Sequence, residues 1–150
     1  MTTLRNRALG ALLGIFAVVS LANVAVASDR PYTEGPVSTV SSIRTEPGMF
    51  ETYMKWLSTT YKPMMEENKK AGIILDYRVY QTQPRSPEDP NLYLVTTYKN
   101  MAAMDGLADK TDATLQKFIG SQEVRDQKAV ERGKMRTQIG TEMIRELVLK

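Results

Sequence analysis

Three polar side chains alternate along one segment of this chain in a way that suits binding or acid–base chemistry. Asp76, Arg78 and Tyr80 lie two positions apart within residues 73–82, where side chains are expected to alternate between two faces as they do in a β-strand. The three side chains therefore project from one side of the strand. If that side lines a cavity, Arg78 binds a carboxylate or phenolate and Asp76 acts as a base with a raised pKa. The alternative is an Arg78–Asp76 ion pair that fixes the register of a sheet or a dimer.

Two other places offer candidate ligand-binding residues. Trp56, with Tyr53 and Tyr61, forms either a wall on which a ligand stacks or the core face of an amphipathic helix. Arg44 lies near the end of the first predicted strand, and it joins the candidate site if the register turns it toward the same cavity.

The chain has no histidine and no cysteine, which excludes several classes of chemistry. Without them it has no Ser-His-Asp triad, thiol nucleophile, thiolate metal site or histidine-ligated haem in their ordinary forms. Methionine pairs at Met64–Met65 and at Met101 and Met104 suit Cu(I) as thioether ligands, or they fill the core as flexible side chains. We expect no cofactor and no metal.

The N-terminal 27 residues have the pattern of a secretory signal peptide. Arg5 and Arg7 precede an apolar run over residues 8–26, which ends at a small-x-small site at Ala25 to Ala27. The alternative is an uncleaved membrane anchor, because the run is almost long enough to span a bilayer. We expect cleavage after Ala27, a periplasmic or secreted protein, and no stable membrane anchor once the signal is removed. No basic stripe with interleaved aromatic residues is present, so nucleic acid is not an expected partner.

The remaining chain predicts one domain that follows a polar arm. We expect an arm over residues 28–36 and a domain over 37–150 whose elements run in the order β-α-β-β-α-β. Pro63 should kink or restart the first helix near Tyr61 and Lys62, because proline donates no backbone N–H and clashes with the preceding turn. The strands are expected at 37–45, 73–82, 92–98 and 141–149, and a mostly charged helix is expected at 122–138.

This order predicts an α+β, ferredoxin-like βαββαβ fold, with a four-stranded antiparallel sheet and helices on one face. The opposite face is left uncovered. The strand predicted at 141–149 carries large aliphatic side chains on both of its faces, such as Met143 and Ile144. A strand that is apolar on both sides is most simply covered on both sides, so we expect a homodimer formed sheet to sheet.

In the order of its elements the chain resembles the dimeric α/β-barrel proteins, which include antibiotic-biosynthesis monooxygenase-like and NIPSNAP-like proteins. The resemblance covers residues 37–149. It rests on the element order and on a long first helix that ends Lys69-Lys70-Ala71-Gly72 and leads into Asp76-Tyr77-Arg78-Val79-Tyr80. It implies two subunits around a central cavity. Cofactor-free monooxygenases of this group hold phenolic substrates with aromatic and polar cavity residues.

Three functions follow from these features as hypotheses. The first is an exported homodimer that binds a small aromatic or acidic molecule in a cavity between its sheets. The second is a cofactor-independent monooxygenase or isomerase that acts on a small phenolic or acidic substrate through Asp76, Arg78 and Tyr80. The third is a protein-interaction module that uses the charged segment 122–138 and the arm at 28–36; a solvated helix face is the alternative for the charged segment.

Overall fold

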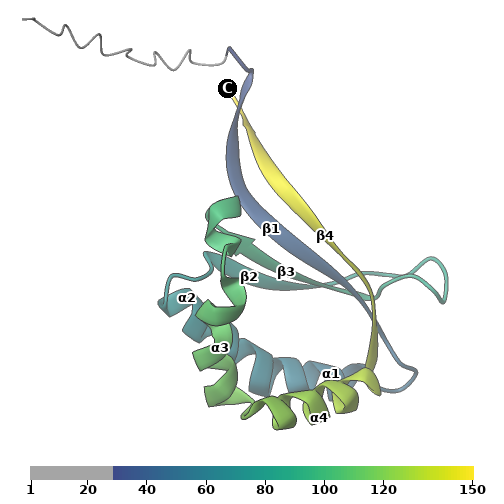
Figure 1. Ribbon diagram of the computed structural model, residues 1–150. Coiled ribbons are helices and arrows are strands. Elements are labelled where there is room, and N and C mark those ends of the chain that lie inside the picture. Colours follow the sequence, from purple (N-terminus) through teal and green to yellow (C-terminus); the bar gives the residue numbers. More distant parts are fainter. Residues whose placement is uncertain (1–28) are drawn as a thin grey trace, which may run out of the picture.

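The computed structural model describes residues 29–150. Its strands and helices follow one another in the order that the sequence predicts (Figure 1). They are β1 (Tyr32–Thr45), α1 (Phe50–Trp56), a π-helical turn η1 (Leu57–Tyr61), α2 (Lys62–Lys70), β2 (Asp76–Gln81), β3 (Leu92–Tyr98), a 3₁₀ turn η2 (Met101–Met104), α3 (Leu107–Phe118), α4 (Gln122–Gly133) and β4 (Arg136–Leu149).

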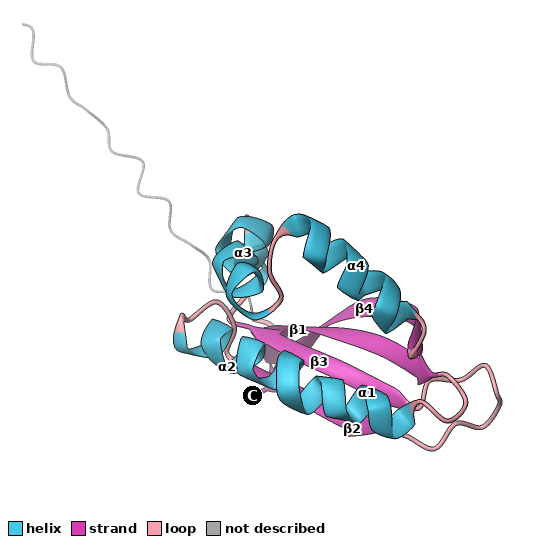
Figure 2. Ribbon diagram, turned by 90° about the horizontal axis from the view of Figure 1, so that it is seen from below, coloured by secondary structure: helices cyan, strands magenta, loops and turns pink. Residues whose placement is uncertain are grey.

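The four strands form one antiparallel sheet in the order β2-β3-β1-β4. The two central strands, β1 and β3, are separated in the sequence by the first helical stretch and by β2, and the helices lie together on one side of the sheet (Figure 2). This is the predicted ferredoxin-like α+β fold, because interleaved β-α-β crossovers of one hand place both helical layers on the same face.

The register decides which side chains meet the helices. Val37 is paired with Tyr98 and Ile43 with Leu92, and these four side chains are buried on the helix side. Tyr77 and Val79 of β2 pack against the same core. The odd-numbered residues of β2 therefore face the helices as predicted, and Asp76, Arg78 and Tyr80 face the other way. From here we call the uncovered side the open face.

The first helical stretch changes its winding where Pro63 enters it. Leu57–Tyr61 forms a π-helical turn between α1 and α2, and Pro63 lies in the first turn of α2. The wider turn relieves the clash between the proline ring and the carbonyls of the preceding turn. The hydroxyls of Ser58 and Thr59 both donate to the carbonyl of Lys55, each at 2.9 Å. The predicted irregularity at Tyr61 is confirmed, and the stretch ends at Gly72 with a positive φ of 70°.

The N-terminal end of the described chain differs from the arm predicted at residues 28–36. Residues 32–36 belong to β1, which begins at Tyr32 and pairs there with Leu149 of β4. The register shifts between Glu34 and Val37. Glycine suits position 35 because the Cβ of any other residue would be crowded there, at 3.1 Å from the Cβ of Glu146. Together β1 and β4 extend beyond the body as a two-stranded ribbon (Figure 1).

The C-terminal boundary also differs from the prediction. The helix expected over 122–138 ends at Gly133, and the strand expected at 141 begins at Arg136. The backbone N–H of Glu46 donates to the carbonyl of Met135, and Arg136 is paired with Thr45. Pairing with the end of β1 thus draws residues 136–140 into the sheet, although their polar composition is compatible with a helix.

The predicted signal peptide and its cleavage site lie outside the described residues. Within residues 29–150, none of the helices combines the length and the apolar composition that crossing a bilayer requires.

Candidate functional site

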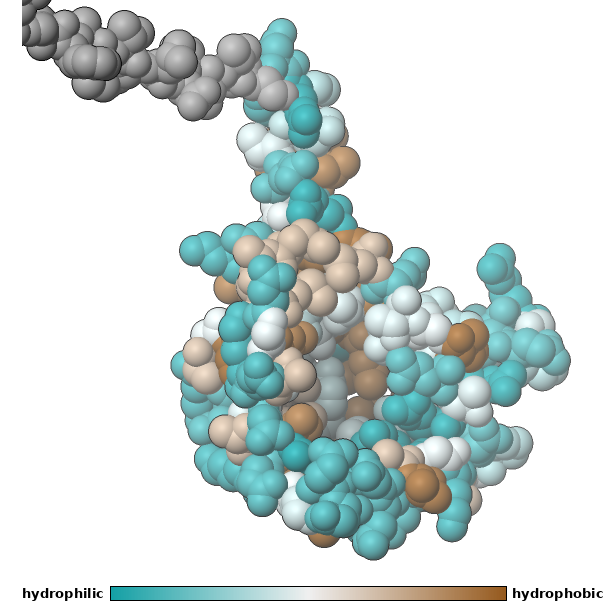
Figure 3. Space-filling view, viewed as in Figure 1, coloured by the Kyte–Doolittle hydropathy of each residue, from teal (hydrophilic) through white to brown (hydrophobic). Residues whose placement is uncertain are grey.

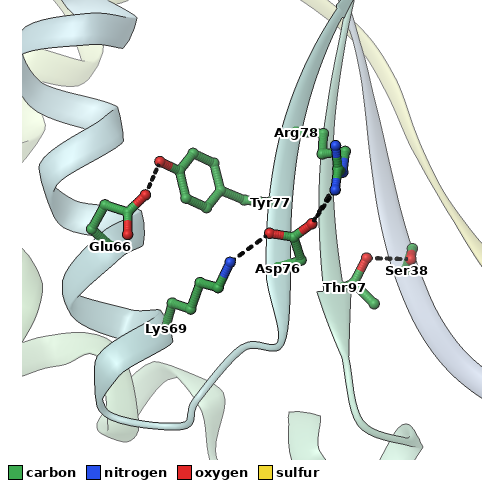
Figure 4. Close-up of polar contacts among 7 residues, drawn as sticks. All are labelled: Ser38, Glu66, Lys69, Asp76, Tyr77, Arg78 and Thr97. Carbon is green, nitrogen blue, oxygen red and sulfur yellow. Dashed lines mark hydrogen bonds and ion pairs between the residues drawn. The ribbon is translucent and has the colours of Figure 1, made fainter.

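The first group of candidates lies together on the open face. Figure 4 shows Asp76 between two cations: the Lys69 Nζ donates to Asp76 Oδ1 at 2.8 Å, and the Arg78 Nε donates to Oδ2 at 3.0 Å. Beside them, the hydroxyls of Ser38 and Thr97 lie 2.9 Å apart across β1 and β3. Tyr80 projects from the same face and is 51% exposed. The strand therefore places the three predicted residues on one side, with Asp76 and Arg78 in contact.

The electrostatics of Asp76 are opposite to what a general base needs. Its hydrogen bond from Lys69, with the nearby charges of Lys69 and Arg78, holds the pKa of the carboxyl below its usual value. A base that works near neutral pH needs a raised pKa. In the single chain, Asp76 is therefore a carboxylate held in ion pairs with Lys69 and with Arg78 of the same strand.

Arg44 is separate from that group and lies at the end of the sheet. It lines a hollow of about 360 Å³ beside the β2–β3 loop, and its Nη1 donates to the carbonyl of Pro87 at 3.4 Å. The polar groups around this hollow are used by the loop itself. Asp89 accepts from the backbone N–H groups of Arg85 and Ser86, and Asn91 donates to the hydroxyl of Thr45. Arg44 therefore supports a loop.

A second and smaller pocket lies on the helix side, and Trp56 is one of its walls. Its volume is about 180 Å³. Figure 3 shows the surface hollowed between the strands and the helices of this side. Eight residues from η1, α3, α4 and their neighbouring segments line it: Trp56, Thr60, Phe118, Ile119, Lys128, Glu131, Arg132 and Met135. We call this the helix-side pocket. Four of its walls, Trp56, Phe118, Ile119 and Met135, are apolar and partly buried.

Aromatic stacking fixes the orientation of Trp56. Its ring lies parallel to that of Tyr53, with the centroids 5.7 Å apart and 6° between the planes. Arg132 lies above the indole with its guanidinium carbon 5.0 Å from the ring centroid, a distance suited to a cation–π interaction. Tyr53 and Tyr61 are buried core residues, as the core reading of the aromatic stripe predicts, and Trp56 packs against this core and also borders the pocket.

Buried phenols lie behind Trp56. Burial raises the pKa values of Tyr53 and Tyr61, so both are neutral at physiological pH. The neighbouring Thr96 hydroxyl partly offsets this effect at Tyr61. The positive charges of Arg136 and Arg132 partly offset it at Tyr53. Among residues 29–150, however, the Tyr53 hydroxyl has no partner with hydrogen-bond geometry.

Sequence reasoning missed most of this pocket. It singled out Trp56 but treated the segment that contains Lys128, Glu131, Arg132 and Met135 as a solvated face or a partner surface. These four residues follow one another at intervals of three, one and three positions, which places them on one face of a helix and of the turn that follows it. This helical spacing could have identified the four residues as one face of a helix. Phe118 and Ile119 are apolar, but nothing local in the sequence shows which other element they meet.

Residues 29–150 bring together no group of three or more acidic, histidine or cysteine side chains that could hold a metal ion. The Met64 side chain is buried in the core cluster and Met65 packs against it, as the core-filling alternative predicts. Met101 is 45% exposed on η2.

Comparisons with known proteins give similarity in fold only. No protein-family model matches the chain, and no curated protein matches it. Among solved structures, HapK from Hahella chejuensis is similar, with 10% identity, 73% of this chain and 91% of that chain covered, and a TM-score of 0.49. A dimeric ferredoxin-like protein from an uncultured marine organism has 10% identity, covers 79% and 90%, and has the same TM-score of 0.49. Protein SO0527 from Shewanella oneidensis has 14% identity, covers 78% and 96%, and has a TM-score of 0.47.

Proposed function

We propose that this chain is an exported protein that binds a small molecule in the helix-side pocket. The observation that carries this proposal is the composition of the pocket, in which aromatic and aliphatic walls surround a few converging polar groups. Trp56, Phe118 and Ile119 supply apolar walls, and Lys128, Glu131 and Arg132 supply the charges. Mostly apolar concave sites with a few placed polar groups are typical of ligand pockets.

The size of the pocket limits the ligand. A protein cavity of about 150 Å³ takes up a benzene molecule, and the helix-side pocket measures about 180 Å³. It therefore has room for one aromatic ring with a small substituent. This supports the expectation of a small aromatic or acidic ligand, and it moves the binding site from the space between two sheets to the space under the helices of one chain.

The structural observations favour binding over the other two hypotheses. A monooxygenase or isomerase that uses Asp76 as a base needs that carboxyl to accept a proton near neutral pH, and its ion pairs with Lys69 and Arg78 oppose this. An interaction module would use the charged face of α4, but three of its charged residues, Lys128, Glu131 and Arg132, line the helix-side pocket.

We also propose that the chain is a homodimer joined by its open faces. Tyr80 and Ile144 project from this face and are 51% and 50% exposed. Pairing two such faces removes apolar surface from water at about 25 cal/mol per Å². Export through a signal peptide at residues 1–27 remains part of the proposal and predicts that the mature chain begins at Ser28.

Trp56 allows a direct test, because it is the only tryptophan of the chain. We would titrate purified mature protein with a panel of single-ring aromatic compounds and follow the Trp56 fluorescence, with calorimetry as an independent measure. We expect saturable binding by at least one compound. The variant Ile119→Gln, which alters a pocket wall, should weaken this binding.

The matched control lies on the other side of the sheet. Arg78→Gln alters the open face and should leave the affinity unchanged, while circular dichroism shows that both variants are folded. If Arg78→Gln abolishes binding and Ile119→Gln does not, the ligand lies on the open face and the helix-side pocket is the wrong site. If the folded wild type binds no member of the panel, the binding function itself is wrong.

A further inference from the structure

Two guanidinium groups lie at the junction between α4 and β4, next to the wall of the helix-side pocket. Arg132 is in the last turn of α4 and Arg136 is the first residue of β4. Both side chains are partly buried. Arg136 donates through Nη1 to the Gln138 side chain at 3.1 Å, while its Nε is buried and has no partner among residues 29–150.

Neither guanidinium forms an ion pair within the described part of the chain. Two acidic side chains near this junction contact other groups. Glu131 lies 2.8 Å from the Lys128 Nζ, and Glu46 accepts a hydrogen bond from the Thr137 hydroxyl at 2.8 Å. Burial and the charge of Arg136 lower the pKa of Arg132. Partly buried charges without a counter-ion are costly, and a bound anion would relieve that cost.

The buried phenol of Tyr53 adds a third donor without an acceptor. Its side chain is fully buried at 0% exposure, and its hydroxyl has no hydrogen-bond partner within residues 29–150. Because burial raises its pKa, the hydroxyl keeps its proton and is able to donate. The guanidinium groups of Arg132 and Arg136 present only donors, and the Tyr53 hydroxyl carries a proton that it can donate, so the complementary ligand group is an acceptor and is best an anion.

We infer that the helix-side pocket selects small planar organic acids of one ring, with the carboxylate held by Arg132, while Arg136 and Tyr53 lie behind this wall of the pocket. This rests on the proposed binding function and names its ligand class. The planar fork of Arg132 matches the two oxygens of a carboxylate. The aromatic walls Trp56 and Phe118 cover the ring of the acid. A phosphate ester is the less suitable anion, because its larger tetrahedral group takes up space that the ring needs.

The test compares two probes of nearly equal size, benzoate and benzamide, of which only benzoate is charged. We expect benzoate to bind the mature wild-type protein at least about tenfold more tightly than benzamide, since hydrogen bonds to charged groups are the stronger ones. The Arg132→Gln variant should lose about tenfold or more in affinity for benzoate and little for benzamide. Arg132→Lys keeps the charge and should retain part of the benzoate preference.

Lys134→Gln is the matched control, because it removes one positive charge from an exposed position in the same connection. It should leave the preference for benzoate unchanged. Equal binding of both probes to the wild type, or equal loss for Lys134→Gln and Arg132→Gln, overturns the inference and leaves the pocket function standing. Binding of neither probe nor of any single-ring compound by folded protein removes the pocket function, and this inference with it.

Discussion

Tyr53 combines complete burial in the core with a hydroxyl that lacks a hydrogen-bond partner within residues 29–150. A buried unsatisfied hydroxyl costs about 1–3 kcal/mol of folding free energy. Tyr61 lies about two turns further along the same helical stretch, and its hydroxyl is not among the buried side-chain atoms that lack a partner.

This contrast predicts opposite effects of the same substitution. Tyr53→Phe should raise the free energy of unfolding by about 1 kcal/mol, because it removes an unpaired buried hydroxyl and leaves the ring in place. Tyr61→Phe should lower it by about 1 kcal/mol, because it removes a partnered hydroxyl. Urea denaturation of both variants measures the difference. A clear loss of stability in Tyr53→Phe would mean that its hydroxyl is satisfied in solution.

Tyr77 predicts how stability depends on alkaline pH. Burial and its hydrogen bond to Glu66, at 2.6 Å, raise the pKa of this phenol from its usual 10.0 to about 12 (Figure 4). Between pH 10 and 12 the unfolded chain has lost this proton while the folded chain keeps it. The stabilisation is therefore complete below pH 10 and is lost as the pH rises through that window.

Urea midpoints measured from pH 9 to 12 test this dependence. The wild type should lose stability steadily above pH 10, and Tyr77→Phe should show a shallower decline. An identical decline in both proteins would show that Tyr77 titrates alike in the folded and unfolded states.

At the scale of elements, the connections around α3 and α4 determine the shape of the helix-side pocket. Gly120, between these helices, has a φ of +118°, and a Cβ there would lie 3.3 Å from the Val124 side chain. Gly133 lies at the end of α4, where a Cβ would meet open space. The first glycine is required by the backbone and by close contact, whereas the second is tolerated.

Alanine at these two glycines should therefore act in opposite directions. Gly120→Ala should reduce the free energy of unfolding by about 1–2 kcal/mol, through strain at positive φ. Gly133→Ala should increase it by about 0.5–1 kcal/mol, because alanine favours helix more than glycine does. Thermal or urea unfolding of the two variants gives the comparison. Equal effects would contradict the assigned backbone geometry of the α3–α4 connection.

At the scale of the whole molecule, β4 is the least covered element of the chain. Nearly all of its residues are exposed, including Met143 toward the helices and Ile144 toward the open face, at 48% and 50%. A long exposed edge strand with apolar side chains favours association unless another element covers it. A second copy packed on the open face would cover one of these two sides.

The proposed homodimer leads to a prediction about the number of copies in solution. Native mass spectrometry of the mature chain should show two copies, and Ile144→Lys should shift the population to monomers, because a charge would be buried at the contact. Val130→Lys is the control, since Val130 is 66% exposed on α4 away from the sheet. A wild-type chain that stays monomeric at micromolar concentration would rule out the dimer.

The sequence by itself determined the order of elements, the side of β2 that faces the core and the irregularity before Pro63. These features follow from local patterns, namely alternation, helical spacing and the missing N–H of proline. Pairing with Thr45 and Leu149 was decided only in the tertiary structure, and it extended β4 back to Arg136 and turned residues 32–36 into strand. The same holds for the site, because Trp56 and Arg132 are 76 positions apart in the sequence and only packing brings the indole and the guanidinium together.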